Sequence, residues 1–193
     1  MTRRRASSEQ VAKIVRRCLE QGGTVEIDGL GSFRPDGKGG FEFLPETRPK
    51  VFLAYAVEDV EAAERLYGDL IAQGLDPWLD RKKLLPGQNW PRAIERAIAA
   101  SDFFVACFSR RAGGKRGCFQ SELRFALDCA RRLPLEDVFV IPVRFEECGV
   151  PERISRELQY VDLFPDWNKG VRRLLAAIRR QTKQKNRRLP LAG

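Results

Sequence analysis

The chain has 193 residues and a mass of 22.0 kDa, and 43% of its residues are hydrophobic and 32% charged, which is typical of one or two small globular domains. It contains no histidine, which excludes Ser-His and Cys-His catalysis and imidazole metal ligands. Its five cysteines are odd in number and widely spaced, so we expect neither a disulfide framework nor a metal site. No apolar stretch is long enough to span a bilayer, and we expect a cytoplasmic protein without membrane contact.

The net charge of +9 is unevenly distributed along the chain. Residues 1–50 carry ten Lys/Arg and seven Asp/Glu, residues 51–170 carry 17 and 19, and residues 171–193 carry eight and none. The basic character therefore belongs to the C-terminal end. We predict that residues 181–193 form a solvated basic tail, with weak phosphate binding as the alternative.

The first 49 residues are predicted to form a small unit of one helix and a β-hairpin. Ser7 and Gln10 have the spacing of a capping box, and a Gly-Gly pair ends the helix. Its apolar residues share one face: Val11, Ile14, Val15 and Leu19. Strand-like runs follow at residues 24–28 and 41–44. Because so short a unit buries little apolar surface, we expect it to pack on the rest of the chain or on another copy.

From residue 50 to residue 180, apolar strand-like runs alternate with amphipathic helices. The strands are predicted near residues 51–55, 75–79, 103–108, 138–143 and 159–163, and the helices near residues 58–73, 91–99, 118–132 and 168–180. This alternation predicts an α/β fold, a five-stranded parallel sheet with helices on both faces. Ligands of such sheets bind beyond the carboxyl ends of the strands, where the strand order reverses. We therefore expect a site within residues 54–59, 80–90 and 109–122.

Three motifs of this central segment occur in the order of one known family. Residues 51–59 (VFLAYAVED) resemble the first conserved box of the TIR (Toll/interleukin-1 receptor) family in its bacterial form, and residues 76–90 (DPWLDRKKLLPGQNW) resemble its second strand and BB loop. Residues 116–123 (RGCFQSEL) take the place of its W-C-x-x-E-L helix. The resemblance covers roughly residues 50–180, and it agrees with a flavodoxin-like sheet of strand order 2-1-3-4-5.

The resemblance implies one of two activities, TIR–TIR binding alone or cleavage of NAD+. The discriminating residue is the glutamate of the W-x-x-x-E motif, here Glu122. Nicotinamide leaves C1′ of the ribose as a neutral ring, so the step needs no general acid, but it does need negative charge beside an oxocarbenium-like centre. Glu122 is therefore the predicted catalytic residue, and a solvent-facing helical glutamate is the alternative.

The resemblance also suggests substrate-binding residues at the ends of the first three strands and in the following segments. The set comprises Tyr55, Ala56, Asp80, Lys83, Leu84, Gly87, Trp90, Ser109, Cys118 and Phe119. Lys83 is a candidate to pair with the diphosphate, and an exposed loop lysine with no specific role is the alternative. Cys118 stands where many members have tryptophan, so either Phe119 supplies the aromatic contact with nicotinamide or that contact is weaker here. Core packing is the alternative for Tyr55 and Trp90, and helix capping for Ser109.

The N-terminal unit carries a second, shorter resemblance. Residues 22–33 and 41–49 are similar to a hairpin of the HU/IHF family, although a short turn at residues 35–40 replaces the long DNA-binding arm and the final helix is missing. Self-association is therefore favoured over DNA reading, and a lid on the chain's own TIR domain is the remaining alternative.

These observations together predict a TIR-domain NAD+ glycohydrolase that releases nicotinamide and either ADP-ribose or a cyclic isomer. As the resemblance implies, it would act in bacterial antiphage defence when assembled through the BB loop (80–90) and activated by a partner or signal. NAD+ is its substrate, and no cofactor or metal is expected. A non-catalytic TIR scaffold is the alternative. A nucleic-acid binder that uses the HU-like unit and the basic tail ranks third, so a nucleic-acid partner is not the leading expectation.

Overall fold

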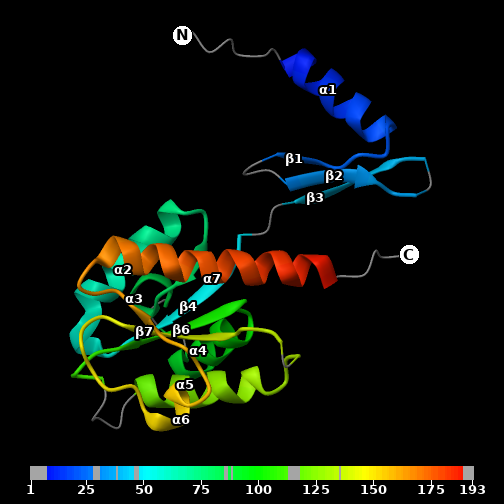
Figure 1. Cartoon of the computed structure of the whole chain (residues 1–193). Helices are drawn as coiled ribbons and strands as arrows, with labels where there is room; N and C mark the ends of the chain where they lie inside the picture. The colour runs from blue at the N-terminus through cyan, green and yellow to red at the C-terminus, as the bar shows by residue number, and fades with distance from the viewer. Residues whose placement is uncertain are drawn as a thin grey trace. The chain divides into compact units, whose positions relative to one another are not determined.

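The computed structural model describes residues 8–27, 31–37, 39–45, 48–84, 87, 89–112, 118–134 and 136–188. Contacts between residues divide the chain into two compact units, Met1–Arg48 and Pro49–Gly193 (Figure 1). Each unit is described below by itself. Within the described residues, no helix is both long enough and apolar enough to cross a lipid bilayer.

The N-terminal unit consists of one helix and a three-stranded antiparallel sheet. Helix α1 (Ser8–Glu20) precedes strands β1 (Val25–Ile27), β2 (Gly31–Pro35) and β3 (Phe41–Pro45), which lie in the order β1-β2-β3. The predicted helix is confirmed, whereas the two-stranded hairpin is corrected to three strands. Strand β2 was missed because its glycine, proline and lack of alternation disfavour a strand locally, and pairing on both of its edges supplies the stabilisation instead.

Apolar side chains of the N-terminal unit are divided between its interior and its surface. Leu19 is buried, and the rings of Phe33 and Phe43 pack with centroids 4.6 Å apart. Ile14, predicted to share the buried face of the helix, is 67% exposed, and Phe41 is 48% exposed. The unit thus leaves large apolar side chains uncovered. Ser7, the predicted helix cap, lies outside the described residues.

The second unit is a doubly wound α/β structure. Its strands are β4 (Lys50–Ala54), β5 (Asp76–Trp78), β6 (Phe103–Phe108), β7 (Val140–Arg144) and β8 (Val161–Asp162). Its helices are a 3-10 turn (Val57–Asp59), α2 (Val60–Ala72), α3 (Asp80–Lys83), α4 (Trp90–Ala99), α5 (Cys118–Ala130), α6 (Glu152–Ser155) and α7 (Trp167–Arg188). The five strands are parallel in the order β5-β4-β6-β7-β8, which is the predicted 2-1-3-4-5 and confirms the α/β fold.

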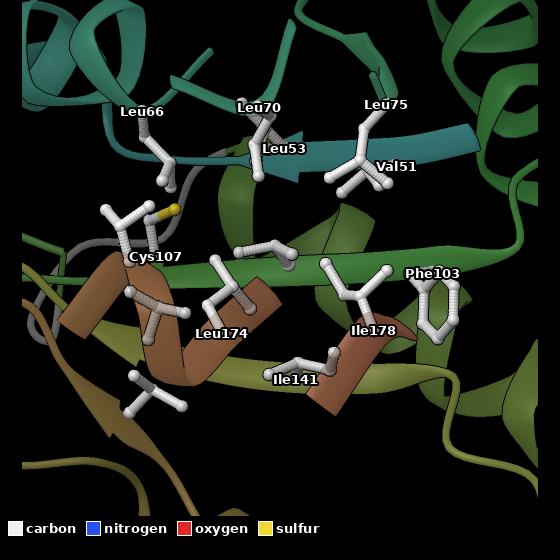
Figure 2. Close-up of a cluster of buried hydrophobic side chains, with 14 of the residues drawn as sticks. Val51, Leu53, Leu66, Leu70, Leu75, Phe103, Cys107, Ile141, Leu174 and Ile178 are labelled. Carbon is white, nitrogen blue, oxygen red and sulfur yellow. The ribbon is translucent and has the colours of Figure 1, made fainter. Parts of the chain in front are cut away.

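Both faces of this sheet are covered by helices, which explains why its strands are almost entirely apolar. Val51 and Leu53 of β4 point to the face covered by α2 and α7, whereas Phe52 and Ala54 point to the face covered by α4 and α5. The first of these apolar layers is shown in Figure 2, where Leu174 of α7 is among the labelled residues. The alternation of two residues along each strand therefore builds two separate cores from one sheet.

Helix α7 continues through Arg188, and this corrects the prediction that a solvated tail begins at residue 181. Gln181 is only 5% exposed, and its Nε2 donates to the carbonyl oxygen of Glu136 at 3.3 Å. One turn later, Lys185 Nζ donates to the carbonyl oxygen of Asp102 at 3.2 Å and lies 5.1 Å from the ring centroid of Phe103. These contacts with distant segments hold the helix on the domain despite its polar sequence. Residues 189–193 of the predicted tail lie outside the described residues.

Candidate functional site

The sheet brings its central strands β4 and β6 together at the point where the chain changes direction. The connection from β4 leads to β5 on one side, whereas that from β6 leads to β7 on the other, so a crevice forms beyond their carboxyl ends. A pocket of about 400 Å³ lies there. It is lined by Phe52, Leu53, Tyr55, Ala56, Val57, Glu58, Trp78, Asp80, Arg81, Arg111, Ala112, Cys118, Phe119 and Glu122.

The carboxyl of Glu122 lines this pocket from the first turns of α5. It is partly buried, and the pKa of its side chain is raised from the usual 4.5 to about 7. The first cause is burial, which removes water from the charged form, and the second is the negative charge of Asp80. Near neutral pH this carboxyl therefore lies close to the midpoint between its protonated and ionised forms, a state that suits a residue that exchanges protons.

Tyr55 and Asp80 also line the pocket and are joined by a direct hydrogen bond. The phenol oxygen of Tyr55 donates to Asp80 Oδ1 at 2.6 Å, and the backbone N–H of Arg81 donates to the same oxygen at 2.7 Å. Burial, then the hydrogen bond to Asp80, raises the pKa of Tyr55, so its hydroxyl stays protonated at neutral pH. Tyr55 also packs against the apolar core. Core packing and pocket lining were alternatives for Tyr55 in the sequence analysis, and Tyr55 does both.

Four aromatic side chains line the pocket, and two of them, Phe52 and Trp78, were not anticipated. Phe119 is just 6% exposed, because its ring packs edge-on against Phe108 with centroids 5.4 Å apart. Trp78 ends strand β5 and is more accessible, and it stacks on Phe52 at 4.7 Å. The sequence signal for Trp78 was its place two residues before Asp80. Trp78 is therefore more accessible than the buried Phe119.

Several predicted binding residues do not line this pocket. Lys83 Nζ lies 3.6 Å from Asp76 Oδ1 in an exposed ion pair, so its charge is already engaged. Leu84 is partly buried and Gly87 is exposed with a positive φ of 82°, the backbone conformation that glycine tolerates best. These residues belong to the segment in which residues 85, 86 and 88 lie outside the described part of the chain.

Ser109 has a structural place beneath the pocket rather than on its wall. It is 2% exposed, and its hydroxyl donates to Asp59 Oδ2 at 2.5 Å. Ser109 Oγ in turn accepts hydrogen bonds from the backbone N–H groups of Arg111 and Ala112, both at 3.1 Å. Ser109 therefore organises the turn formed by residues 110–112 after β6.

Two arginines of the pocket were missed by sequence reasoning. Arg81 follows Asp80 in α3, and Arg111 follows β6 and donates from Nη1 to the carbonyl oxygen of Glu58 at 3.4 Å. Both lie in segments that the strand-order rule had selected, so that rule was the signal that could have found them. They give an otherwise acidic pocket two guanidinium groups.

A second hollow, of about 500 Å³, adjoins the first between α4 and α5. It is lined by Trp90, Pro91, Ile94, Glu95, Ile98, Cys118, Ser121, Glu122 and Phe125. Trp90, at the start of α4, is 48% exposed and belongs to this hollow only. Cys118 and Glu122 line both hollows and thus separate them. Within the described ranges, no three acidic or cysteine side chains are grouped as metal ligands would be.

The fold first defines the class, a doubly wound α/β protein with strand order 2-1-3-4-5 and a pocket at its switch point. Within that class, the sequence pattern of the TIR domain matches residues 51–175, and the chain belongs to the TIR domain family. No curated protein matches the chain.

Two solved structures illustrate the shared fold. The TIR domain of the Toll-related receptor TRR-2 from Hydra magnipapillata is 23% identical with a TM-score of 0.56, and the match covers 67% of this chain and 97% of that one. The TIR domains of the activated Roq1 resistosome, which directly recognises the pathogen effector XopQ, are 19% identical with a TM-score of 0.52, covering 67% and 99%. At these identities the likeness concerns the fold alone.

Proposed function

We propose that this protein cleaves the nicotinamide–ribose bond of NAD+ and that Glu122 is its catalytic carboxylate. The TIR family includes NAD+-cleaving enzymes and non-catalytic scaffolds, so membership alone does not decide between them. The observation that carries the proposal is the partly buried Glu122 carboxyl, with its raised pKa, in the pocket at the switch point beside Asp80. A surface scaffold has no need of a carboxyl held at that energetic cost.

The chemistry requires little more than well-placed negative charge. As the bond between C1′ and the pyridinium nitrogen breaks, its electron pair neutralises the ring, and nicotinamide leaves without needing a proton. The ribose carries the resulting positive charge, which the ionised Glu122 stabilises more strongly in a partly desolvated pocket than in water. Water then adds to C1′ and gives a proton to Glu122. A carboxyl with a pKa of about 7 is suited to accept it near neutral pH.

The other pocket residues have complementary roles in this proposal. Asp80 adds negative charge beside Glu122, and Tyr55 holds the Asp80 carboxylate in place through the 2.6 Å hydrogen bond. Ala56, which follows β4, has a small side chain and therefore leaves room in the pocket. Trp78 offers an aromatic face to the leaving nicotinamide ring.

Arg81 and Arg111 are proposed to hold the diphosphate of NAD+, in place of Lys83. Both guanidinium groups line the pocket, whereas Lys83 is paired with Asp76 outside it. A planar guanidinium can donate two parallel hydrogen bonds to a phosphate, which fixes the orientation of the bound dinucleotide.

Activity is further proposed to depend on assembly through the BB loop (80–90). The exposed Trp90 and the hollow between α4 and α5 lie beside Glu122, where a second copy would reach the substrate. The exposed Ile14 and Phe41 of the N-terminal unit offer another surface for self-association. A linear or cyclic ADP-ribose product, activation by a partner or signal, and a role in bacterial antiphage defence belong to the same proposal.

The test is nicotinamide release from NAD+ by the purified full chain over a range of protein concentrations. Glu122→Gln keeps the shape of the side chain and removes its charge, and it should lower release at least about 100-fold. The matched control is Asp128→Asn on the same helix, where the side chain is 64% exposed, and release should remain near that of the wild type. Release that rises faster than linearly with protein concentration supports assembly.

Two results would contradict the proposal. If the wild type releases no nicotinamide at any concentration, with or without added macromolecular crowding, the scaffold function replaces it. If Glu122→Gln retains wild-type release, the reaction uses another group.

A further inference from the structure

The outer face of helix α7 is rich in basic side chains. Nine of its 22 residues are Lys or Arg and none is Asp or Glu, so this one helix carries a charge equal to the whole chain's net +9. The remainder of the sequence is therefore neutral overall. The charge is a property of one element rather than of the protein.

Six of the nine cations of α7 lie opposite its buried side. At 100° per residue, the buried positions and these six cations project in opposite directions around the helix axis. The buried positions are Gly170, Val171, Leu174, Leu175, Ile178 and Gln181. The exposed cations fall within an arc of about 120° and form a basic stripe: Lys169, Arg172, Arg173, Arg179, Arg180 and Lys183.

The basic stripe is held in a fixed line, because α7 is anchored along its length. Gly170 packs so closely on the strand β8 region that an added Cβ would lie 2.4 Å from the carbonyl oxygen of Asp162. Near the other end, Gln181 and Lys185 bond to the loops at Glu136 and Asp102. From Lys169 to Lys183 the stripe spans about 21 Å at 1.5 Å per residue. Anchored cations lose less conformational freedom on binding than those of a frayed tail.

A groove of about 580 Å³ runs beside the stripe, between α2 and α7. Arg172 and Arg179 line it, and Arg179 is positioned by a 3.0 Å hydrogen bond from Nη2 to Gln73 Oε1. The one carboxylate in the groove, Asp69, accepts a hydrogen bond from Trp167 Nε1 at 2.7 Å. The groove therefore combines an accessible depression with two guanidinium donors.

We propose that the basic stripe binds the phosphate backbone of nucleic acid without reading its sequence. A straight row of cations with no acidic neighbour on its helix complements a linear polyanion. In the part of the chain that the structure describes, no ion pair engages Arg172, Arg173, Arg180 or Lys183. Nucleic-acid binding ranked low in the sequence analysis because the C-terminal end was expected to be a solvated tail. The structure instead shows an anchored helix there.

Two other anionic partners fit the stripe less well. A globular acidic protein would need apolar or aromatic anchors at the centre of the contact, and the middle of the arc holds only Ala176. A basic amphipathic helix binds a membrane by inserting its apolar side, but that side of α7 packs on the sheet. A linear polyanion remains as the best match.

The experiment measures binding of the full chain to a fluorescein-labelled DNA duplex of about 30 base pairs with scrambled sequence, between about 50 and 200 mM KCl. With six phosphate contacts, log K should fall with log[KCl] with a slope near −5, a loss of about 1000-fold over this range. The variant Arg173→Gln/Arg180→Gln/Lys183→Gln should bind at least about tenfold more weakly at the lowest salt, with a slope shallower by about 3.

The matched control lowers the net charge equally on other elements. It is Arg96→Gln/Arg132→Gln/Arg153→Gln, three exposed arginines outside α7, and its binding should stay within about threefold of the wild type. Thermal melting checks that each variant is folded. Lys169→Gln/Arg172→Gln provides a second stripe variant if the first is unstable.

Three outcomes overturn the inference. One is that the wild type fails to bind the duplex at the lowest salt, and another is that the control loses as much affinity as the stripe variant. The third is that a poly-glutamate peptide of equal charge binds as tightly as the duplex, because that would assign the stripe to acidic proteins. The assay does not depend on NAD+ cleavage, so it stands or falls separately from the proposed enzymatic function.

Discussion

The α4/α5 face of the sheet carries ionisable side chains inside a pocket, whereas the α2/α7 face carries them on its outer surface. Burial of Glu122 and the nearby negative charge of Asp80 together raise the pKa of Glu122 to about 7. On the opposite face, Leu174 and Ile178 of α7 belong to an apolar layer (Figure 2). Arg172, Arg173, Arg179 and Arg180 of the same helix are exposed. Burying charge is costly and exposing it is not, so the first face has the features of a reactive site and the second those of a binding surface.

The largest effect on stability is expected from the apolar layer of the α2/α7 face. Leu174→Ala should lower the free energy of unfolding by about 2–5 kcal/mol, because Leu174 is fully buried and its removal leaves a cavity. Arg173→Ala, at the exposed residue next to Leu174, should change the free energy of unfolding by less than about 0.5 kcal/mol. Urea denaturation measures both. A loss below about 1 kcal/mol for Leu174→Ala would mean that α7 is not docked as described.

The rate of nicotinamide release should depend on pH through the ionisation of Glu122, on the α4/α5 face. If ionised Glu122 is required, kcat/KM for nicotinamide release rises about tenfold per pH unit below pH 7 and levels off above it. Between pH 5 and the plateau above pH 7 the change is about 100-fold. Steady-state rates measured across this range test it, and a profile that is flat from pH 5 to pH 8 would separate the reaction from the titration of Glu122.

Two glycines sharpen the comparison within the α2/α7 face. Gly170→Ala should destabilise the protein by about 1–3 kcal/mol, because the new Cβ would lie 2.4 Å from the carbonyl oxygen of Asp162 and 2.7 Å from Leu163 Cα. Gly68→Ala, in α2, meets nothing within 4 Å and should stabilise by about 0.5–1 kcal/mol. Thermal melts distinguish the two. Equal shifts in the same direction would show that Gly170 does not approach strand β8 closely.

The charge in the pocket should also affect stability in a pH-dependent way. Because the folded-state pKa of Glu122 is raised from 4.5 to about 7, the folded state binds more protons than the unfolded state between these values. Stability therefore falls as pH rises through this window and stays lower above pH 7. Glu122→Gln removes the effect, so it should be about 1–3 kcal/mol more stable than the wild type at pH 8 and little different at pH 4.

Chemical denaturation at both pH values checks this prediction, with Asp128→Asn as the exposed control. A gain of equal size at pH 4 and pH 8 would attribute the stabilisation to packing instead of charge.

A smaller loss of stability than that of Leu174→Ala is expected at the hydrogen bond between Tyr55 and Asp80. Tyr55→Phe keeps the ring in the core and removes the hydroxyl that donates to Asp80 at 2.6 Å, which should cost about 1–2 kcal/mol of stability. Asp80 would keep its bond from the N–H of Arg81. Denaturation of Tyr55→Phe alone, of Asp80→Asn alone and of both together gives the coupling energy. A coupling near zero would show that the bond adds nothing beyond packing.

The α/β unit was predictable because its local and tertiary preferences agree. The runs at residues 51–55 and 103–108 are apolar throughout, as buried parallel strands require, and became β4 and β6. Strand β2 was not predictable in this way, because Gly31 and Pro35 disfavour a strand until its neighbours pair with it. The C-terminal part of α7 was missed for the same kind of reason, since Gln181 is polar and its burial depends on Glu136.

The site was predictable by segment but only partly by residue. Tyr55, Asp80 and Glu122 do line one pocket, whereas Ser109 and Lys83 are engaged elsewhere by Asp59 and Asp76. The roles of these residues in catalysis stay predictions. Sequence reasoning could not separate Lys83 from Arg81, because two cations two residues apart on a short helix point to different sides and no local pattern says which side faces the pocket.

The sequence by itself determined the order of strands and helices, the exclusion of histidine chemistry and the concentration of positive charge near the C-terminus. These follow from composition and periodicity, which are local properties of the chain. Only the tertiary structure decided that Glu122 lies beside Asp80, that Tyr55 bonds to a residue 25 positions away, and that the basic end is an anchored helix. Burial and electrostatic environment are set by segments distant in sequence, so the same side chain can be a solvated charge or a reactive group.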